Sequence, residues 1–138
     1  MKTAHPPSPW SAALPEAVGW AADAAWEKHA EAIVVLDLRG MGAFTDFFLI
    51  CSAGSGRQIS AVRDAVEEHL ERRRIRAAHR EGRGTEEWVL LDYGRFVVHI
   101  FSQRARLYYD LERLWRAARR HEFAGTGVAS REKKTADE

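Results

Sequence analysis

The chain has 138 residues, of which 46% are hydrophobic and 30% are charged, as in ordinary soluble globular domains. This length suits one domain with a sizeable core, and the composition excludes the collagen-like, coiled-coil and membrane-embedded classes. Lysine and arginine number 21 against 20 acidic residues. The net charge of +1 therefore gives no overall electrostatic reason to bind nucleic acid.

Both ends of the chain differ from its middle. Pro6, Pro7 and Pro9 fix backbone angles that do not suit a helix, so residues 1–13 are expected to form a flexible arm. Residues 121–138 are expected to form a disordered tail, because all periodicity is lost from Gly125 onward. One domain is therefore predicted over residues 14–120.

The cellular location is inferred from what the sequence lacks. No apolar run approaches the roughly 18 to 20 residues that a membrane-spanning helix needs, and the N-terminal residues contain no hydrophobic segment of the kind found in signal peptides. The single cysteine, Cys51, lies in an apolar run and is expected to be a small buried side chain in a reducing compartment. The cytoplasm is the expected location.

The first half of the chain is predicted to form a helix, two strands and a second helix. Pro15 suits the first turn of a helix, and apolar residues then recur at helical spacing to about residue 30. Residues 33–38 and 47–53 are continuous apolar runs, which indicate strands covered on both faces. Ser55 and Gln58 form a capping box that begins the second helix. Its apolar stripe consists of Ile59, Val62, Val66 and Leu70.

A cluster of arginines follows this second helix. Arg72, Arg73, Arg74 and Arg76 suit a helix C-terminus, where positive charge interacts favourably with the helix dipole. As an RNA-binding patch they are weak evidence. Residues 75–80 are predicted to form a short edge strand before a loop.

A β-hairpin is predicted over residues 88–101. Two apolar runs rich in β-branched and aromatic residues flank a turn that contains Gly94. If Tyr93 and Gly94 are the two turn residues, Asp92 faces Arg95 and Trp88 faces His99.

The two faces of this hairpin differ in character, since side chains alternate between faces. One face is entirely apolar and is expected to be core; it carries Val89, Leu91, Phe96, Val98 and Ile100. The other face mixes apolar and polar groups; it carries Trp88, Leu90, Asp92, Arg95, Val97 and His99. This second face is either half covered by a helix or a recognition face for a partner.

Ser102 is placed to cap a final helix that packs on the sheet. Its expected apolar stripe is Leu107, Leu111, Leu114 and Ala118, widened by Tyr108 and Trp115. The elements together predict a mixed α/β (α+β) fold with a single mixed sheet of about five strands and three main helices.

Several short motifs could carry catalysis or ligand binding. Gly54-Ser55-Gly56 lies where backbone amides could hold a phosphate, although Ser55 already serves as a helix cap. Asp37, Asp46 and Asp92 lie in or beside three strands and either converge on a metal or serve as loop caps and turn partners. No histidine has a cysteine or histidine partner at zinc-ligand spacing. A triad of Ser52, His99 and Asp92 would be an arbitrary selection.

Four segments resemble the Iojap family of ribosomal silencing factors. Residues 88–94, 97–101 and 109–115 match the family's W-V-L-L-D-Y-G, V-V-H-[IV]-F and Y-[DN]-L-E-x-L-W patterns. The family's opening pattern, D-x-R-x-[LM]-x-x-x-[TA]-D-[FY]-F-[LV]-I, is matched from Asp37 to Ile50. The resemblance covers roughly residues 17–118 and is far more specific than a short phosphate-loop pattern.

This resemblance implies a fold and a function. The family has a fold related to nucleotidyltransferases, enzymes that hold Mg²⁺ with a D-x-D pair, but no such pair occurs on a predicted strand here. Members of the family are not catalysts, so no enzyme activity, cofactor or metal is expected. The implied function is a translation repressor that binds ribosomal protein fourteen of the large subunit and blocks joining of the small subunit.

The predicted partner-binding residues lie on the hairpin and the final helix; they are Trp88, Leu90, Asp92, Tyr93, Val97, His99 and Tyr109. If a helix covers Trp88, the binding surface is instead expected on the loop at residues 39–46 or at Tyr109. Arg95 stands where the family commonly has an acidic residue, and it is expected to pair with Asp92. A homodimer is left open, and no DNA or membrane partner is expected. The alternative function is a nucleotide-binding or nucleotidyl-transferring enzyme.

Overall fold

The computed structural model describes residues 15–82 and 87–123. Its helices are α2 (Glu16–Glu27), α3 (Gly56–Glu71), α4 (Gln103–Tyr109) and α5 (Leu111–Leu114). Its strands are β1 (Glu31–Asp37), β2 (Phe47–Ala53), β3 (His79–Glu81), β4 (Trp88–Asp92), β5 (Phe96–Ser102) and β6 (Arg119–Glu122).

All the strands belong to one six-stranded sheet in the order β3-β4-β5-β2-β1-β6. The central strands β2 and β5 are parallel, and every other neighbouring pair is antiparallel. α3 lies in the connection between β2 and β5, as a parallel pair requires a long crossover. The predicted mixed α+β fold is therefore confirmed, with one more strand than expected.

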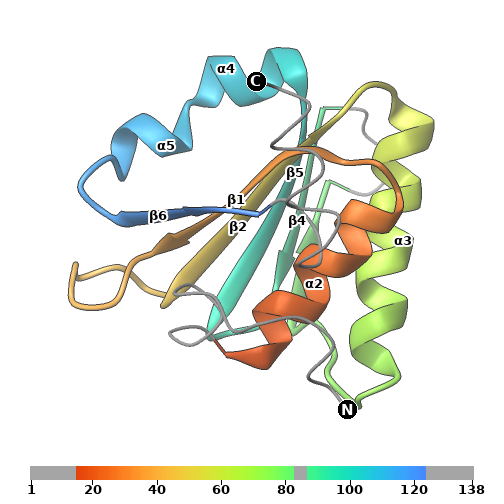
Figure 1. Ribbon diagram of the computed structural model, residues 1–138, viewed down its shortest axis with the longest axis horizontal. Coiled ribbons are helices and arrows are strands. Elements are labelled where there is room, and N and C mark those ends of the chain that lie inside the picture. Colours follow the sequence, from red (N-terminus) through yellow and green to blue (C-terminus); the bar gives the residue numbers. More distant parts are fainter. Residues whose placement is uncertain (1–14, 83–86, 124–138) are drawn as a thin grey trace, which may run out of the picture.

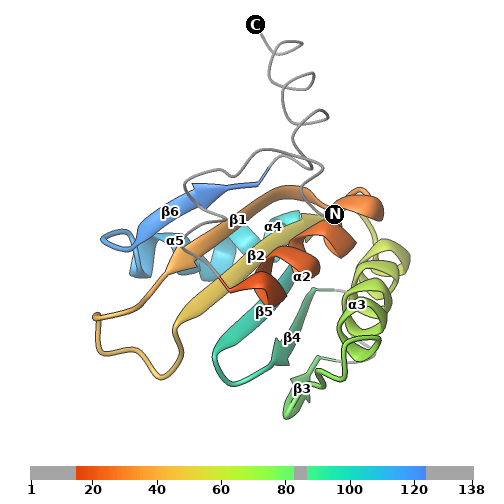
Figure 2. The ribbon, with the colours of Figure 1, turned by 60° about the horizontal axis from the view of Figure 1, so that its bottom comes forward.

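Helices cover both faces of this sheet (Figures 1 and 2). α2 and α3 lie on one face, over a first core of buried side chains that includes Val35, Leu49 and Val98. α4 and α5 lie on the other face, over a second core that includes Leu36, Phe48 and Phe101. β1, β2 and β5 are apolar on both faces because each contributes to both cores, as the continuous apolar runs predicted.

The hairpin formed by β4 and β5 has the predicted faces but a different register. Tyr93 donates its N–H to the carbonyl of Phe96 at 2.9 Å, so the two turn residues are Gly94 and Arg95. Gly94 has φ +86, the left-handed conformation that glycine adopts without strain. Trp88 consequently lies opposite Phe101 and not His99, which lies opposite Leu90. The predicted pairing is wrong by two positions, and a shift of two leaves every side chain on its predicted face.

The final helix is shorter than predicted. Ser102 caps α4, since its Oγ accepts from the N–H of Ala105 at 3.0 Å, but Asp110 adopts a left-handed conformation with φ 49 and ψ 53. This residue ends α4 and turns the chain before α5. Leu107 and Leu114 are 81% and 71% exposed, so the prediction that they pack on the sheet is wrong.

Beyond α5 the chain returns to the sheet as β6. This strand was missed because its sequence, Arg-Arg-His-Glu, has no apolar pattern. It pairs with β1 and runs to Glu122, past the expected domain boundary at residue 120. Phe123 is buried beyond it, with its ring centroid 6.2 Å from that of Trp26.

Cys51 in β2 should not react with thiol reagents in the folded protein. Its side chain is fully buried, and burial raises the pKa of the thiol to about 12, so the reactive thiolate is scarce at neutral pH. We expect a coloured disulfide reagent to modify Cys51 slowly in buffer and rapidly in concentrated urea. Equal rates in the two conditions would contradict this burial.

Candidate protein-binding groove

A groove of about 340 Å³ opens on the second-core face of the sheet, near the β3 edge. Its walls come from the loop before β2 and from strands β3, β4 and β5. The lining residues are Phe44, His79, Glu81, Gly82, Trp88, Leu90, Asp92 and Val97. Apolar side chains with a few charged groups among them are typical of surfaces that bind a protein partner.

Trp88 is held in place by other aromatic rings. Its ring centroid lies 4.9 Å from that of Phe101 and 4.6 Å from that of Tyr109 in α4. Its indole Nε1 donates to Nδ1 of His99 at 3.1 Å. Its ring packs against these neighbours and also lines the groove, a position that aromatic anchors commonly take in protein interfaces.

His99 supports this anchor from beneath. The bond from Trp88 requires Nδ1 to be an acceptor, which puts the proton of the neutral ring on Nε2. Nε2 is buried and has no hydrogen-bond partner among the described residues. The ring packs edge-on to Phe48, with centroids 4.5 Å apart. Burial lowers the pKa of His99 to about 3, so the side chain is neutral at physiological pH.

The structure brings together most of the residues predicted to bind a partner. Trp88, Leu90, Asp92 and Val97 line the groove, and the Tyr109 ring, in a residue that is 48% exposed, packs at a tilt against Trp88. Two predicted residues differ. His99 is only 3% exposed and can support the groove but hardly contact a partner. Tyr93 lies on the opposite face, where it packs against the first core.

Sequence reasoning missed four of the groove residues, which are Phe44, His79, Glu81 and Gly82. Phe44 is 75% exposed at the rim, and it belongs to the loop at residues 39–46 that was expected to bind only if a helix covered Trp88. His79 and Glu81 in β3 lie 2.6 Å apart, between Nε2 and Oε2. An exposed phenylalanine in a glycine-rich loop was the available signal for Phe44.

The turn of the hairpin carries different charge pairs from those expected. The Asp92 carboxylate accepts from the N–H of Gly94 at 2.8 Å, which stabilises the turn. The Arg95 guanidinium instead lies 3.4 Å from the Asp46 carboxylate in the loop before β2. The predicted pair between Arg95 and Asp92 is therefore wrong, and Asp92 keeps its position at the groove.

The residues considered for a metal site or a phosphate loop have structural roles in the fold. Within the described ranges, no three His, Cys, Asp or Glu side chains are grouped to hold a metal. Asp37 pairs with Arg39 at 2.7 Å, and this hydrogen-bonded guanidinium lowers the pKa of Asp37. Ser55 caps α3 by accepting from the N–H of Gln58 at 3.1 Å, as predicted. Gln58 Oε1 accepts from the N–H of Gly54 at 2.6 Å, which occupies an amide of the proposed phosphate loop.

Two of the clustered arginines are engaged within the protein. Arg72 pairs with Glu68 at 3.0 Å, and the Arg73 guanidinium lies 4.1 Å from the ring centroid of Trp20. The cluster consequently offers less free positive charge than the sequence suggests.

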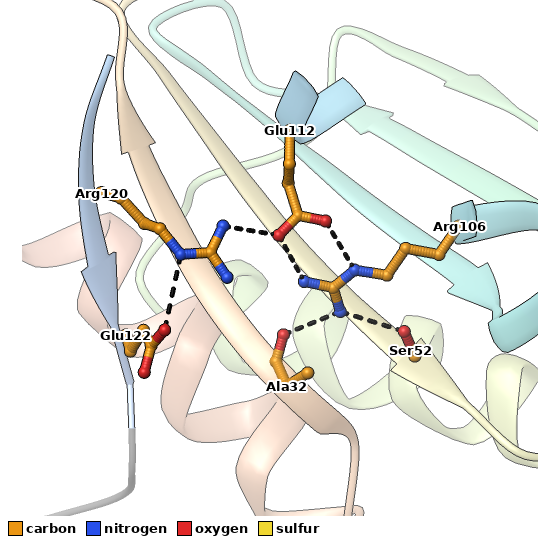
Figure 3. Close-up of polar contacts among 6 residues, drawn as sticks. All are labelled: Ala32, Ser52, Arg106, Glu112, Arg120 and Glu122. Atoms are coloured by element: carbon orange, nitrogen blue, oxygen red, sulfur yellow. Dashed lines mark hydrogen bonds and ion pairs between the residues drawn. The ribbon is translucent and has the colours of Figure 1, made fainter. Parts of the chain in front are cut away.

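A polar cluster outside the groove joins the kinked α4–α5 segment to the sheet (Figure 3). The Arg106 guanidinium donates from Nε and Nη2 to the Glu112 carboxylate at 3.0 and 3.1 Å. Its Nη1 donates to the carbonyl of Ala32 and to Ser52 Oγ. Arg120 in β6 also donates to Glu112, at 2.6 Å. These hydrogen bonds lower the pKa of Glu112, that from Arg106 most of all.

The fold is a small α+β domain with an apolar groove beside packed aromatic rings. Among the described helices, none is long and apolar enough to span a membrane. Over residues 11–138 the chain matches the RsfS family, described as "Ribosomal silencing factor during starvation". The chain belongs to this family.

Individual relatives agree with this assignment. The chain is 39% identical over 95 residues to the ribosomal silencing factor RsfS of Bacillus subtilis, a match that covers 69% of this chain and 80% of that one. It is 36% identical over 94 residues to the chloroplastic protein Iojap of Zea mays, covering 68% and 41% of the two chains. A crystal structure of a Chromobacterium violaceum protein matches with a TM-score of 0.71 and 28% identity, over 83% of this chain and 95% of that one. The resemblance to ribosomal silencing factors is confirmed, and the chain's role lies in translation regulation.

Proposed function

We propose that this protein binds ribosomal protein fourteen of the large subunit through the groove and thereby blocks joining of the small subunit. It would act in the cytoplasm as a stoichiometric repressor without catalysis. The observation that carries this proposal is the groove itself, where the anchored Trp88 lies beside Leu90, Asp92 and the exposed Phe44.

The geometry of the groove supports a protein partner. Aromatic anchors that line a concave surface commonly carry most of the free energy of a protein interface. Asp92, His79 and Glu81 supply polar groups around the apolar centre, in the arrangement of an apolar core with a polar rim. Since the whole chain has a net charge of +1, the proposed contact does not depend on general attraction to ribosomal RNA.

Replacing either aromatic side chain of the groove should weaken binding to purified large subunits. We expect Trp88→Ala to reduce affinity roughly thirtyfold or more, because a buried aromatic anchor contributes about 2 kcal/mol or more to an interface. Phe44→Ala should also reduce affinity and should leave the fold intact, since Phe44 is already 75% exposed in the free protein. Equilibrium binding of labelled protein to large subunits measures both effects.

Leu107→Ala provides the matched control. Leu107 is a large apolar residue that is 81% exposed and does not line the groove, so its removal should leave binding unchanged. The proposed groove would be wrong if Leu107→Ala weakened binding as much as Phe44→Ala. Binding of Trp88→Ala and Phe44→Ala at wild-type affinity would also rule it out.

A further inference from the structure

The kink between α4 and α5 and the pair formed by Arg106 and Glu112 depend on each other. The two residues are six positions apart in the sequence. In a continuous α-helix, such residues lie about 9 Å apart along the axis and about 120° apart around it, which does not allow a bidentate ion pair. The left-handed Asp110 turns α5 back so that both guanidinium bonds to Glu112 can form.

The pair is also tied to the sheet. Arg106 Nη1 donates to the Ala32 carbonyl at 2.8 Å and to Ser52 Oγ at 3.0 Å, so one guanidinium connects α4, α5, β1 and β2 (Figure 3). The Arg106 side chain is only 10% exposed and that of Glu112 is 22% exposed. A shielded, bidentate pair of this kind is held more rigidly than an ordinary surface ion pair.

The position of Tyr109 follows from this kink. Tyr109 is the last residue of α4, immediately before Asp110, and its ring lies against Trp88 with centroids 4.6 Å apart. If the segment from Gln103 to Leu114 became a continuous helix, Arg106 would lose Glu112 and would hold α4 to the sheet through Ala32 and Ser52 alone. Tyr109 would then be held less firmly against Trp88.

We infer that Arg106 is a positioning residue of the groove, which, by pairing with Glu112 across the kink at Asp110, keeps Tyr109 packed behind Trp88. This inference rests on the proposed function of the groove. Arg106 itself does not line the groove, so it acts on the partner only through Tyr109 and Trp88.

The test is the substitution Glu112→Gln in the full chain. It removes the charge of the carboxylate with almost no change in size, and the amide NH₂ that replaces one oxygen donates and cannot accept a guanidinium bond. We expect faster amide hydrogen exchange across α4 and α5, and affinity for purified large subunits reduced roughly threefold to thirtyfold. Arg106→Lys should have a smaller effect than Arg106→Gln, because lysine keeps the positive charge. It should still weaken binding, because lysine cannot form the bidentate pair.

Two further variants separate positioning from general stability. Glu68→Gln breaks an Arg–Glu pair on α3, which covers the opposite face of the sheet from the groove (Figure 2), and should leave binding unchanged. In a Tyr109→Ala background, Glu112→Gln should weaken binding no further, since the residue that it positions is already missing. A purely structural role for the pair would reduce affinity equally in both backgrounds.

The inference is overturned if Glu112→Gln leaves hydrogen exchange of α4 and α5 unchanged, or if it loosens them without loss of affinity. Both results could occur while Trp88→Ala still weakens binding, so the proposed function would survive. If Trp88→Ala binds large subunits normally, the groove is not the binding surface and both proposals fail together.

Discussion

Phe101→Ala should lower the free energy of unfolding by about 3 to 5 kcal/mol, the cost of removing a buried aromatic ring and leaving a cavity. Phe101 is fully buried in the second core. Its ring packs against those of His99, Trp88 and Tyr109, so its loss also removes support from the groove. Urea denaturation monitored by circular dichroism would measure the change in the free energy of unfolding.

Phe44→Ala is the matched control for this measurement. It removes the same side chain from a position that is 75% exposed, and we expect a change within about 0.5 kcal/mol. A cost of less than about 1 kcal/mol for Phe101→Ala would mean that the second core is not tightly packed.

Acid should destabilise the protein through His99. Burial lowers its pKa from the ordinary 6.5 to about 3. Between these two pH values the ring is neutral in the folded protein but protonated in the unfolded chain. The stability contributed by neutral His99 is therefore complete above pH 6.5 and is lost as the pH falls toward 3. The slope is about 1.4 kcal/mol per pH unit, which gives a loss of about 2 to 3 kcal/mol at about pH 4.5.

The effect of His99 can be separated from that of the carboxylates. The pKa values of Asp37 and Glu112 are lowered by their arginine partners, so these groups also lose stabilising interactions in acid. His99→Gln keeps an acceptor for the Trp88 indole but does not titrate. Urea midpoints measured from about pH 7 to about pH 4 should fall more steeply for the wild type than for this variant. Parallel curves would show that His99 does not remain neutral in the folded state.

Much of the sheet could be predicted because the apolar pattern determines which side chains share a face. The two faces of the hairpin were predicted correctly, whereas the pairing of Trp88 with His99 was not. A two-residue shift in register leaves both faces unchanged, so the hydrophobic pattern cannot distinguish the alternatives. Only the position of Gly94 as first turn residue does so, because its φ of +86 suits the first central residue of a type II′ turn.

The end of the chain was predicted less well because backbone conformation overrode the periodic pattern. Leu107, Leu111, Leu114 and Ala118 have helical spacing, but one left-handed residue, Asp110, ends α4 and redirects the following turn, which leaves Leu114 exposed. Leu107 lies before this kink and is on the solvent side of α4. Aspartate tolerates this conformation better than most residues, but nothing in its neighbours marks the kink.

Part of the candidate site could be predicted from the sequence and part could not. Trp88, Leu90, Asp92 and Val97 were predicted to share a surface, since they alternate along two paired strands. Phe44, His79 and Glu81 join them from a loop and an edge strand, and local pattern does not determine how such segments pack. The bond between Arg106 and Glu112 was missed because six-residue spacing does not place side chains together on a regular helix.

The two outermost strands of the sheet explain how a protein with an apolar groove can avoid aggregation. β3 is His-Arg-Glu and β6 is Arg-Arg-His-Glu; all but one of these seven residues are exposed. Open strand edges can recruit strands from other chains, and short, highly charged edges oppose this because the added strand would desolvate the charges. The charged edges therefore disfavour edge-to-edge association of the sheet while the apolar groove stays open on its face.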